Sequence, residues 1–178
     1  MPINIIEIKA TCKTPKSIHK MLKSKNAIYK GMDHQVDTYF KTNNGRLKLR
    51  QGNIENTLIF YNRPNQHGPK HSKVLLHKPM ETDSLLEVLS AAMQVKVIVD
   101  KQRHIYFIDN VKFHVDEVKG LGSFVEIEAI DETDTIAIET LQKQCDDYMT
   151  LLKIEQSDLI EHSYSCLLYT SPSPRDRG

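Results

Sequence analysis

Charged side chains recur at alternate positions in several stretches of this sequence that have the pattern of β-strands. One example is Arg46, Lys48 and Arg50, three cations on one face of a short segment. Side chains two residues apart on a strand share a face and lie about 6.5–7 Å apart. The other sets of this kind are Glu7 and Lys9; Lys101 and Arg103; Lys112, His114 and Asp116; and Glu126 and Glu128.

Cations and carboxylates on one sheet surface would suit metal–triphosphate chemistry. A triphosphate carries about four negative charges, and Lys and Arg donate hydrogen bonds to its oxygens, Arg in pairs. Paired carboxylates would repel this anion unless a hard divalent cation, Mg²⁺ or Mn²⁺, lies between them. For any one strand, charges that face bulk water are the simpler interpretation. The same pattern on five strands favours a common cavity. Alternation alone does not show which face of the sheet points inward.

The remaining residues predict the elements that would position these faces. Asn4 to Cys12 alternates between apolar and polar residues and predicts a first strand. Helices are predicted after Thr14, after Thr82 and from Thr133 or Asp134, with a short one around Asp158 to Tyr164. Further strands are predicted at Asp37–Phe40, Arg46–Arg50, Leu58–Tyr61, Ser72–His77, Val95–Phe107, Val111–Val118 and Ser123–Ile130. About eight strands and three long helices, joined mostly as hairpins, predict an antiparallel α+β fold.

Composition excludes several classes of protein. The 178 residues carry 24 Lys and Arg against 23 Asp and Glu, and 39% are hydrophobic, which is typical of one soluble domain. No apolar run is long enough to span a membrane, and three Cys without CxxC spacing form neither a disulfide framework nor a zinc site. We therefore expect a cytoplasmic protein.

The charge is unevenly distributed along the chain. Residues 1–50 have a net charge of +8, and residues 126–162 have −9. A basic nucleic-acid arm would explain the first value but not the second, so nucleic acid is not an expected partner. The lysines that follow the first strand are interpreted as a solvated helix face; they are Lys13, Lys16, Lys20, Lys23 and Lys25.

Other local patterns carry little chemistry. No phosphate-binding G-x-x-x-x-G-K-[ST] loop occurs. His67 and His71 are separated by Gly68 and Pro69, so no helix presents them to a metal. Two roles stay open for His114: a neutral, hydrogen-bonded packing residue, which we favour, or a contact to phosphate.

The end of the sequence differs from the rest. Residues 166–178 contain Ser171-Pro-Ser-Pro174 and finish in a short charged run. This segment resembles the read-through of a sequencing adapter or an artificial chain end. We therefore expect one domain over residues 1–165, followed by a non-native tail over residues 166–178.

The ordered set of charged motifs resembles the CYTH domain family, which includes class IV adenylate cyclases, thiamine triphosphatases and inorganic triphosphatases. The matching segments are Glu7-Ile-Lys9, Asp37-Thr-Tyr-Phe40, Gly45-Arg-Leu-Lys-Leu-Arg50, Lys101-Gln-Arg103 and Asp116-Glu-Val-Lys-Gly-Leu-Gly-Ser-Phe-Val-Glu-Ile-Glu128. The resemblance runs from Asn4 to about Ser165 and implies an eight-stranded antiparallel β-barrel, a tunnel with a polar interior and about three flanking helices.

The resemblance also implies roles for individual residues. Basic residues would contact the triphosphate, namely Lys9, Lys48, Arg50, Arg63, Lys101 and Arg103, with Arg46 as a supporting contact. Acidic residues would ligate Mg²⁺ or Mn²⁺, namely Glu7, Glu126 and Glu128, with Asp116 as a further ligand or an orienting group. The residues expected to take part in catalysis are Lys9, Arg50, Arg103 and Glu126.

One position departs from the family pattern. The first strand usually reads ExExK, but the first acid is replaced here by Ile5. Asn4 is no simple substitute, because a shift of one residue points to the opposite face. We expect a weaker second metal site, a changed substrate or a loss of activity.

These observations lead to a metal-dependent enzyme that hydrolyses an organic or inorganic triphosphate. An alternative is the conversion of ATP to cyclic AMP and pyrophosphate in the manner of class IV adenylate cyclases. A non-catalytic binder of polyphosphate or nucleotides, encouraged by Ile5, and an RNA 5′-triphosphatase-like role are weaker alternatives. The expected partner is a small-molecule triphosphate, with a homodimer as an option.

Overall fold

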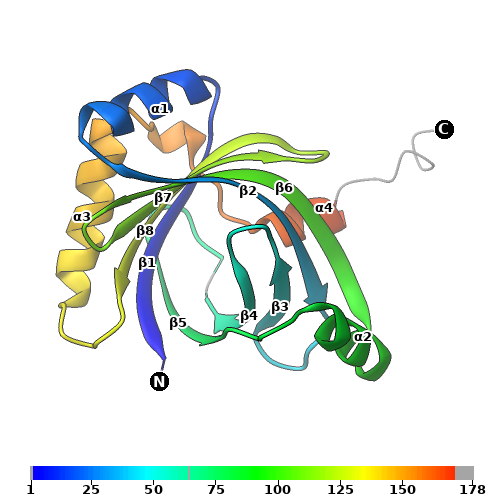
Figure 1. The fold of residues 1–178 in the computed structure, drawn as a ribbon. Helices are drawn as coiled ribbons and strands as arrows, with labels where there is room; N and C mark the ends of the chain where they lie inside the picture. Colours follow the sequence, from blue (N-terminus) through cyan, green and yellow to red (C-terminus); the bar gives the residue numbers. More distant parts are fainter. Residues whose placement is uncertain (1, 64, 171–178) are drawn as a thin grey trace.

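The computed structural model of the protein describes residues 2–63 and 65–170. Eight antiparallel strands close into a barrel in the order β1-β5-β4-β3-β2-β6-β7-β8 (Figure 1). The strands are β1 (Ile3–Thr11), β2 (Ile28–Phe40), β3 (Arg46–Gln51), β4 (Asn56–Asn62), β5 (Lys70–His77), β6 (Val95–Ile108), β7 (Val111–Val118) and β8 (Gly122–Asp131). The helices are α1 (Pro15–Ser24), α2 (Asp83–Ala92), α3 (Ile138–Leu151), α4 (Tyr164–Thr170) and the 3₁₀ turn η1 (Gln156–Asp158). The predicted eight-stranded α+β barrel is confirmed.

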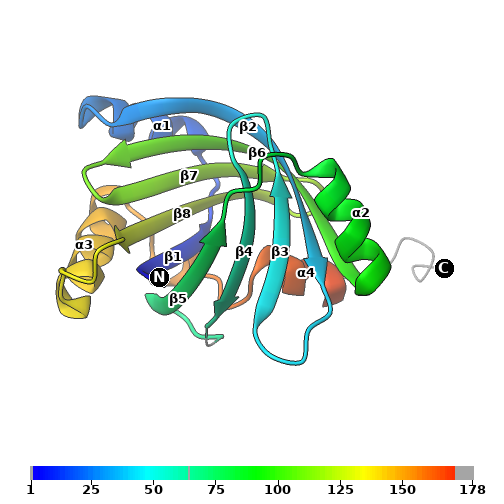
Figure 2. The same cartoon turned by 60° about the horizontal axis from the view of Figure 1, so that its bottom comes forward.

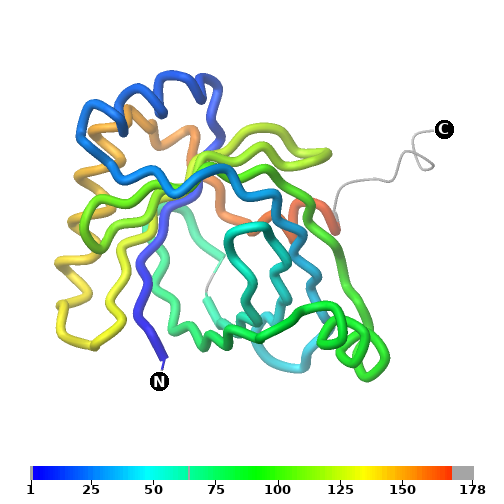
Figure 3. The backbone as a smooth tube through the Cα atoms, viewed as in Figure 1, coloured from blue at the N-terminus to red at the C-terminus, as the bar shows by residue number. Residues whose placement is uncertain are grey.

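The main apolar core lies outside the barrel. On β1, Ile6 and Ile8 point outward into a buried cluster, whereas Glu7 and Lys9 line the interior. Helix α1 contributes Leu22 to this cluster, and α3 contributes Leu141. The tube view shows α1 and α3 on one outer side of the barrel, with α2 apart from them (Figure 3). Because the helices cover the apolar strand faces, the charged faces are left to point into the barrel.

Strand β2 is longer than the four residues predicted from the sequence. It begins at Ile28, and its first half carries Asp33 and Gln35, both fully buried in the barrel interior. Sequence patterning misses such a segment because polar residues normally mark an exposed face. A register shift between Tyr29 and Gly31 breaks the alternation further, as Gly31 has φ +118°.

The elements after β8 also differ from prediction. Helix α3 begins at Ile138, because the Asp131 carboxylate first binds the backbone N–H groups of Thr133 and Ile136 and so holds a turn. The short helix expected around Asp158 to Tyr164 is replaced by η1 and by α4.

The proposed domain end at residue 165 falls inside α4. In this helix Leu167 and Leu168 pack against a small buried cluster. The division at residue 165 stays a prediction, and residues 171–178 of the proposed tail lie outside the described residues. No helix in the described ranges has the length and apolar character needed to cross a bilayer.

Two isoleucines on β1 test the position of the core. Ile8 is 1% exposed and faces the helices, whereas Ile5 lines the cavity. We expect Ile8→Ala to lower the free energy of unfolding by about 2–5 kcal/mol, because it leaves a cavity in packed surroundings. Ile5→Ala should cost about 1 kcal/mol or less, because it opens onto an existing cavity. Urea unfolding of both variants measures the difference, and equal losses would contradict a core placed outside the barrel.

Candidate active site

The barrel encloses a cavity of about 510 Å³ that is lined by residues from all eight strands. The view turned by 60° shows the neighbouring strands β3, β4 and β5 of the barrel side by side (Figure 2). Its lining includes eight Lys and Arg against five Glu, so the interior favours an anion. The predicted site residues that line it are Glu7, Lys9, Lys48, Arg50, Arg63, Lys101, Arg103, Glu126 and Glu128. Arg46 and Asp116 belong to its surroundings rather than to its lining.

Asp37 organises the cations on one side of the cavity. It lies directly opposite Arg50 in the β2–β3 register and accepts two hydrogen bonds from it, both at 2.9 Å. Its Oδ2 also lies 2.7 Å from Nζ of Lys101 and 3.2 Å from Nζ of Lys48. Burial alone would raise the pKa of Asp37, but these three cations hold it well below the ordinary value. The carboxylate therefore stays charged and fixes all three cations.

Asp116 has the same relation to Arg103, two residues along β6 from Lys101. The two residues face each other across β6 and β7, and the carboxylate accepts hydrogen bonds from Nε at 2.8 Å and Nη2 at 2.7 Å. The hydroxyl of Tyr164 donates a third at 2.8 Å. Of the two roles predicted for Asp116, this geometry favours orienting Arg103 over ligating a metal.

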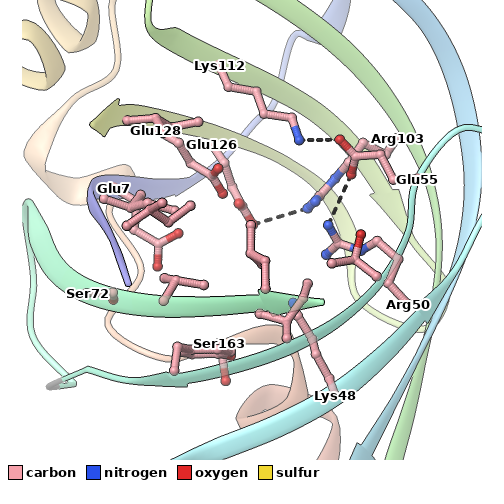
Figure 4. Close-up of a pocket in the computed structure, with 18 of the residues that line it drawn as sticks. Glu7, Lys48, Arg50, Glu55, Ser72, Arg103, Lys112, Glu126, Glu128 and Ser163 are labelled. Carbon is pink, nitrogen blue, oxygen red and sulfur yellow. Dashed lines mark hydrogen bonds and ion pairs between the residues drawn. The ribbon is translucent and has the colours of Figure 1, made fainter. Parts of the chain in front are cut away.

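Glu126 joins the cations to the acidic part of the site. It lies opposite Lys9 on β1, with Oε1 3.4 Å from Nζ of Lys9 and 3.4 Å from Nη2 of Arg103 (Figure 4). Burial opposes ionisation, but Lys9 and Arg103 lower the pKa of Glu126 well below its ordinary value. Glu126 is therefore a carboxylate at neutral pH.

A three-residue group on β7 and β8 fits a divalent cation. Ligand atoms of His114, Glu126 and Glu128 lie within 4.8 Å of one another. Burial lowers the pKa of His114, so its ring is neutral, and Nε2 is buried with no hydrogen-bond partner among the described residues. Two carboxylates with one neutral imidazole suit Mn²⁺ or Mg²⁺ whose remaining positions are filled by water or phosphate. His114 was predicted as a packing residue or a phosphate contact, and the structure adds it to the candidate ligands.

Glu7 is not a member of that three-residue group. It is opposite Glu128 in the β1–β8 register, yet it forms an ion pair with Arg63, which also lines the cavity. The structure therefore brings two of the four predicted metal ligands, Glu126 and Glu128, into one group. Arg46 lies outside the cavity lining and donates a hydrogen bond to Asn65 at 3.0 Å.

Four charged residues that line the cavity received no role in the sequence analysis, namely Glu55, Lys78, Lys112 and Glu132. Glu55 lies before β4, pairs with Arg50 at 3.2 Å and also pairs with Lys112 (Figure 4). No periodic signal marks Glu55, because it lies in a loop. Lys112 was recognised on a charged strand face but was not assigned to the site.

The two ends of the cavity differ in chemistry. At the ends of β2 and β7, an apolar cluster that includes Tyr39, Phe124 and Tyr164 packs around the barrel. At the other mouth, where β1 begins and β8 ends, Lys78 and Glu132 line the cavity together with many apolar residues, namely Ile3, Ile5, Ile54, Ile59, Val74, Leu76, Phe107 and Ile130. Ile5 is thus one of several apolar groups that make the outer part of the cavity hydrophobic.

Comparison with known proteins agrees with this architecture. The sequence matches the CYTH domain over residues 4–164, and the chain belongs to this family, whose members are metal-dependent triphosphatases or adenylate cyclases. No curated protein sequence matches it.

Solved structures share the fold at low identity. PH1012 from Pyrococcus horikoshii is 22% identical, with a TM-score of 0.77 and coverage of 94% of this chain and 99% of that chain. An adenylate cyclase candidate from Vibrio parahaemolyticus is 17% identical, with a TM-score of 0.77 and coverage of 92% and 97%. The cyclase candidate HpAC1 from Hippeastrum, which has a dominant triphosphatase activity, is 15% identical, with a TM-score of 0.61 and coverage of 95% of both chains.

The buried lysines predict proton uptake when a polyanion binds. Burial lowers the pKa of Lys101 and of Lys9, and only part of this effect is offset by Asp37 and by Glu126. A bound triphosphate would raise both values again, because it favours the charged ammonium. Tripolyphosphate binding should therefore take up protons and should weaken as pH rises towards the ordinary lysine pKa of about 10.4.

Titration calorimetry in buffers of different ionisation enthalpy measures this uptake. We expect the observed heat to change with the buffer and Lys101→Met to reduce the change. Heats that are independent of the buffer at alkaline pH would contradict the prediction.

Proposed function

We propose that the protein is a metal-dependent hydrolase of an organic triphosphate. The observation that supports this most strongly is the set of cations held by buried carboxylates around one cavity. Asp37 fixes Arg50 and Lys101, and Asp116 fixes Arg103, before any ligand arrives. Donors that are already oriented lose little freedom on binding and respond at once to developing charge.

The cations would bind different parts of the triphosphate. Arg103 and Lys9 lie beside Glu126, where they would bind the phosphate next to the candidate metal group. Lys48, Arg50 and Lys101 converge on Asp37 and would hold the rest of the triphosphate. Arg63 would contribute a further donor from the β4–β5 side. In hydrolysis a water attacks the terminal phosphorus in line with the leaving oxygen, and these side chains would neutralise the charge that develops.

Glu126, Glu128 and His114 would hold the divalent cation. When bound, the cation supplies charge neutralisation for the phosphate oxygens and orients the attacking water. The neutral His114 ring lies 3.2 Å from Glu126 through Nδ1. Nδ1 is the ring atom that faces both glutamates, 3.8 Å from Glu128, so it would offer its lone pair to the cation, and the hydrogen of the neutral ring would then be on Nε2. The imidazole favours Mn²⁺ over Mg²⁺, because Mg²⁺ prefers oxygen ligands.

The apolar mouth favours an organic triphosphate over an inorganic one. Ile5, Ile59, Val74 and Ile130 would cover an apolar or aromatic group, while the charged interior holds the phosphates. This feature also favours the second candidate, cyclisation of ATP, because a nucleobase would fit such a mouth. In that reaction the ribose 3′-oxygen attacks the α-phosphorus and pyrophosphate leaves.

Product analysis would distinguish these reactions. The protein is incubated with Mg²⁺ or Mn²⁺ and, separately, with ATP, thiamine triphosphate or tripolyphosphate. Orthophosphate release supports hydrolysis, cyclic AMP with pyrophosphate supports cyclisation, and binding without turnover with either metal would leave a non-catalytic binder. Release from a triphosphorylated RNA end in preference to free nucleotides would support the RNA 5′-triphosphatase-like role. The cytoplasmic location and the homodimer remain predictions.

Glu126→Gln tests the acidic group directly. We expect turnover to fall by about 10²-fold or more, because the amide is a poorer metal ligand and weakens the orientation of Lys9 and Arg103. Triphosphate affinity should change much less. Glu117→Gln, on the outer face of β7, is the matched control and should retain full activity. Unchanged turnover of Glu126→Gln would remove this residue from the mechanism.

Ile5→Glu tests the apolar mouth. We expect the ratio of kcat/KM for an organic triphosphate to that for tripolyphosphate to fall by about tenfold, because a charge replaces an apolar contact with the organic group. Ile5→Leu should leave the ratio unchanged. If Ile5→Glu lowered both values of kcat/KM equally, the mouth of the cavity would not contact the organic group.

A further inference from the structure

A second concave site lies on the outer face of the barrel, between α1, β2 and β6. It is a shallow groove of about 510 Å³ that is separate from the barrel cavity. On β6 the side chains alternate, so that Arg103 lines the cavity while His104 lines the groove. We call it the α1 groove, and its lining residues are Lys16, His19, Lys20, Lys23, Tyr29, His104 and Tyr106.

Four rings form a continuous aromatic surface in the α1 groove. Tyr29 packs against the Tyr106 ring, with centroids 4.8 Å apart, and its hydroxyl lies 2.7 Å from Nδ1 of His104, whose ring is inclined to it by 23°. His19 meets His104 edge to face at 4.7 Å. Tyr29 is 47% exposed, which is unusual for a large aromatic side chain already packed on one face. Such a ring offers its outer face to a planar ligand.

A hydrogen-bond donor lies beside these rings. Tyr106 is 2% exposed, and its hydroxyl lies 2.6 Å from Nδ1 of His19. Because the buried hydroxyl has no other acceptor among the described residues, it donates to Nδ1. The ring of His19 is neutral, since burial lowers its pKa, and its hydrogen must then be on Nε2. Nε2–H has no hydrogen-bond partner among the described residues and is available to an anion.

The lysines supply the charge. Lys16, Lys20 and Lys23 follow one another at intervals of four and three residues, so they lie on one face of α1 along about 10 Å. Helix α1 contains no acidic residue, and no Asp or Glu lines the α1 groove. A row of cations beside exposed rings is the combination that binds nucleotides, with phosphates on the cations and bases on the rings.

We propose that the α1 groove is a nucleotide-binding site in which Tyr29 stacks on the base and the lysines and His19 bind the phosphate. The sequence analysis interpreted these lysines as a solvated face, because it could not place Tyr29 and His104 beside them. The ligand is a nucleotide, either free or within a single strand. The proposal does not depend on the chemistry of the barrel cavity.

The test uses two probes that lack a triphosphate: fluorescently labelled adenosine 5′-monophosphate and a 5′-hydroxyl penta-adenylate, with binding followed by fluorescence anisotropy. Tyr29→Ala should weaken binding about tenfold, and Tyr29→Phe should stay within twofold of the wild type, because the ring remains. The double variant Lys20→Ala/Lys23→Ala should weaken binding about tenfold and reduce its dependence on salt. Tighter binding of the oligonucleotide would identify a strand as the ligand; equal affinity would identify the free nucleotide.

Two controls separate this site from general effects. The pair Lys13→Ala/Lys25→Ala removes the same charge from residues that do not line the α1 groove and should change binding by less than twofold. Lys48→Ala alters only the barrel cavity and should likewise leave binding intact. Thermal unfolding confirms that each variant is folded.

Several results would overturn the proposal. They are no binding of either probe at millimolar concentration, equal losses in the two double-lysine variants, an unchanged affinity in folded Tyr29→Ala, or a loss confined to Lys48→Ala.

Discussion

The structure depends on buried carboxylates that neutralise buried cations. Asp37 and Asp116 are among the least exposed residues of the chain, and each is held by an arginine through two hydrogen bonds. A cation buried without such a partner would cost several kcal/mol. Neither aspartate lines the cavity, so each one compensates its arginine from behind. The cavity keeps an excess of positive charge while the surrounding barrel remains stable.

This charge arrangement requires a barrel with its apolar core on the outside. Ile8 and Leu22 pack in the layer between the strands and the helices α1 and α3, and Leu141 closes the same layer. The interior is then free of the close packing that fills a small barrel of ordinary composition. Strand registers decide which charges meet: Lys9 faces Glu126, Asp37 faces Arg50, and Arg103 faces Asp116. The fold therefore builds the site through cross-strand neighbours.

Individual residues show where sequence patterns stop being informative. Lys9 and Glu126 were recognisable because they alternate with apolar neighbours on regular strands. Glu55 was missed because it lies in a loop, where no period identifies a face. The first half of β2 was missed because Asp33 and Gln35 are buried in a polar interior. Patterning equates polar with exposed, and that assumption fails inside a tunnel.

Alternation and turn residues were sufficient to predict the strands with regular apolar faces, the antiparallel connections between them and the identity of most charged groups that line the cavity. They could not show whether a given strand face points into the barrel or away from it, because both faces of a strand repeat every two residues. Tertiary structure alone separated the orienting Asp116 from Glu126 and Glu128, and it alone placed His114 with those two glutamates. It also brought Tyr29 next to the lysines of α1. The reason is that the role of a carboxylate depends on which groups bind its oxygens. Strand register and the closure of the barrel determine those groups, and they bring together residues that are far apart in the sequence.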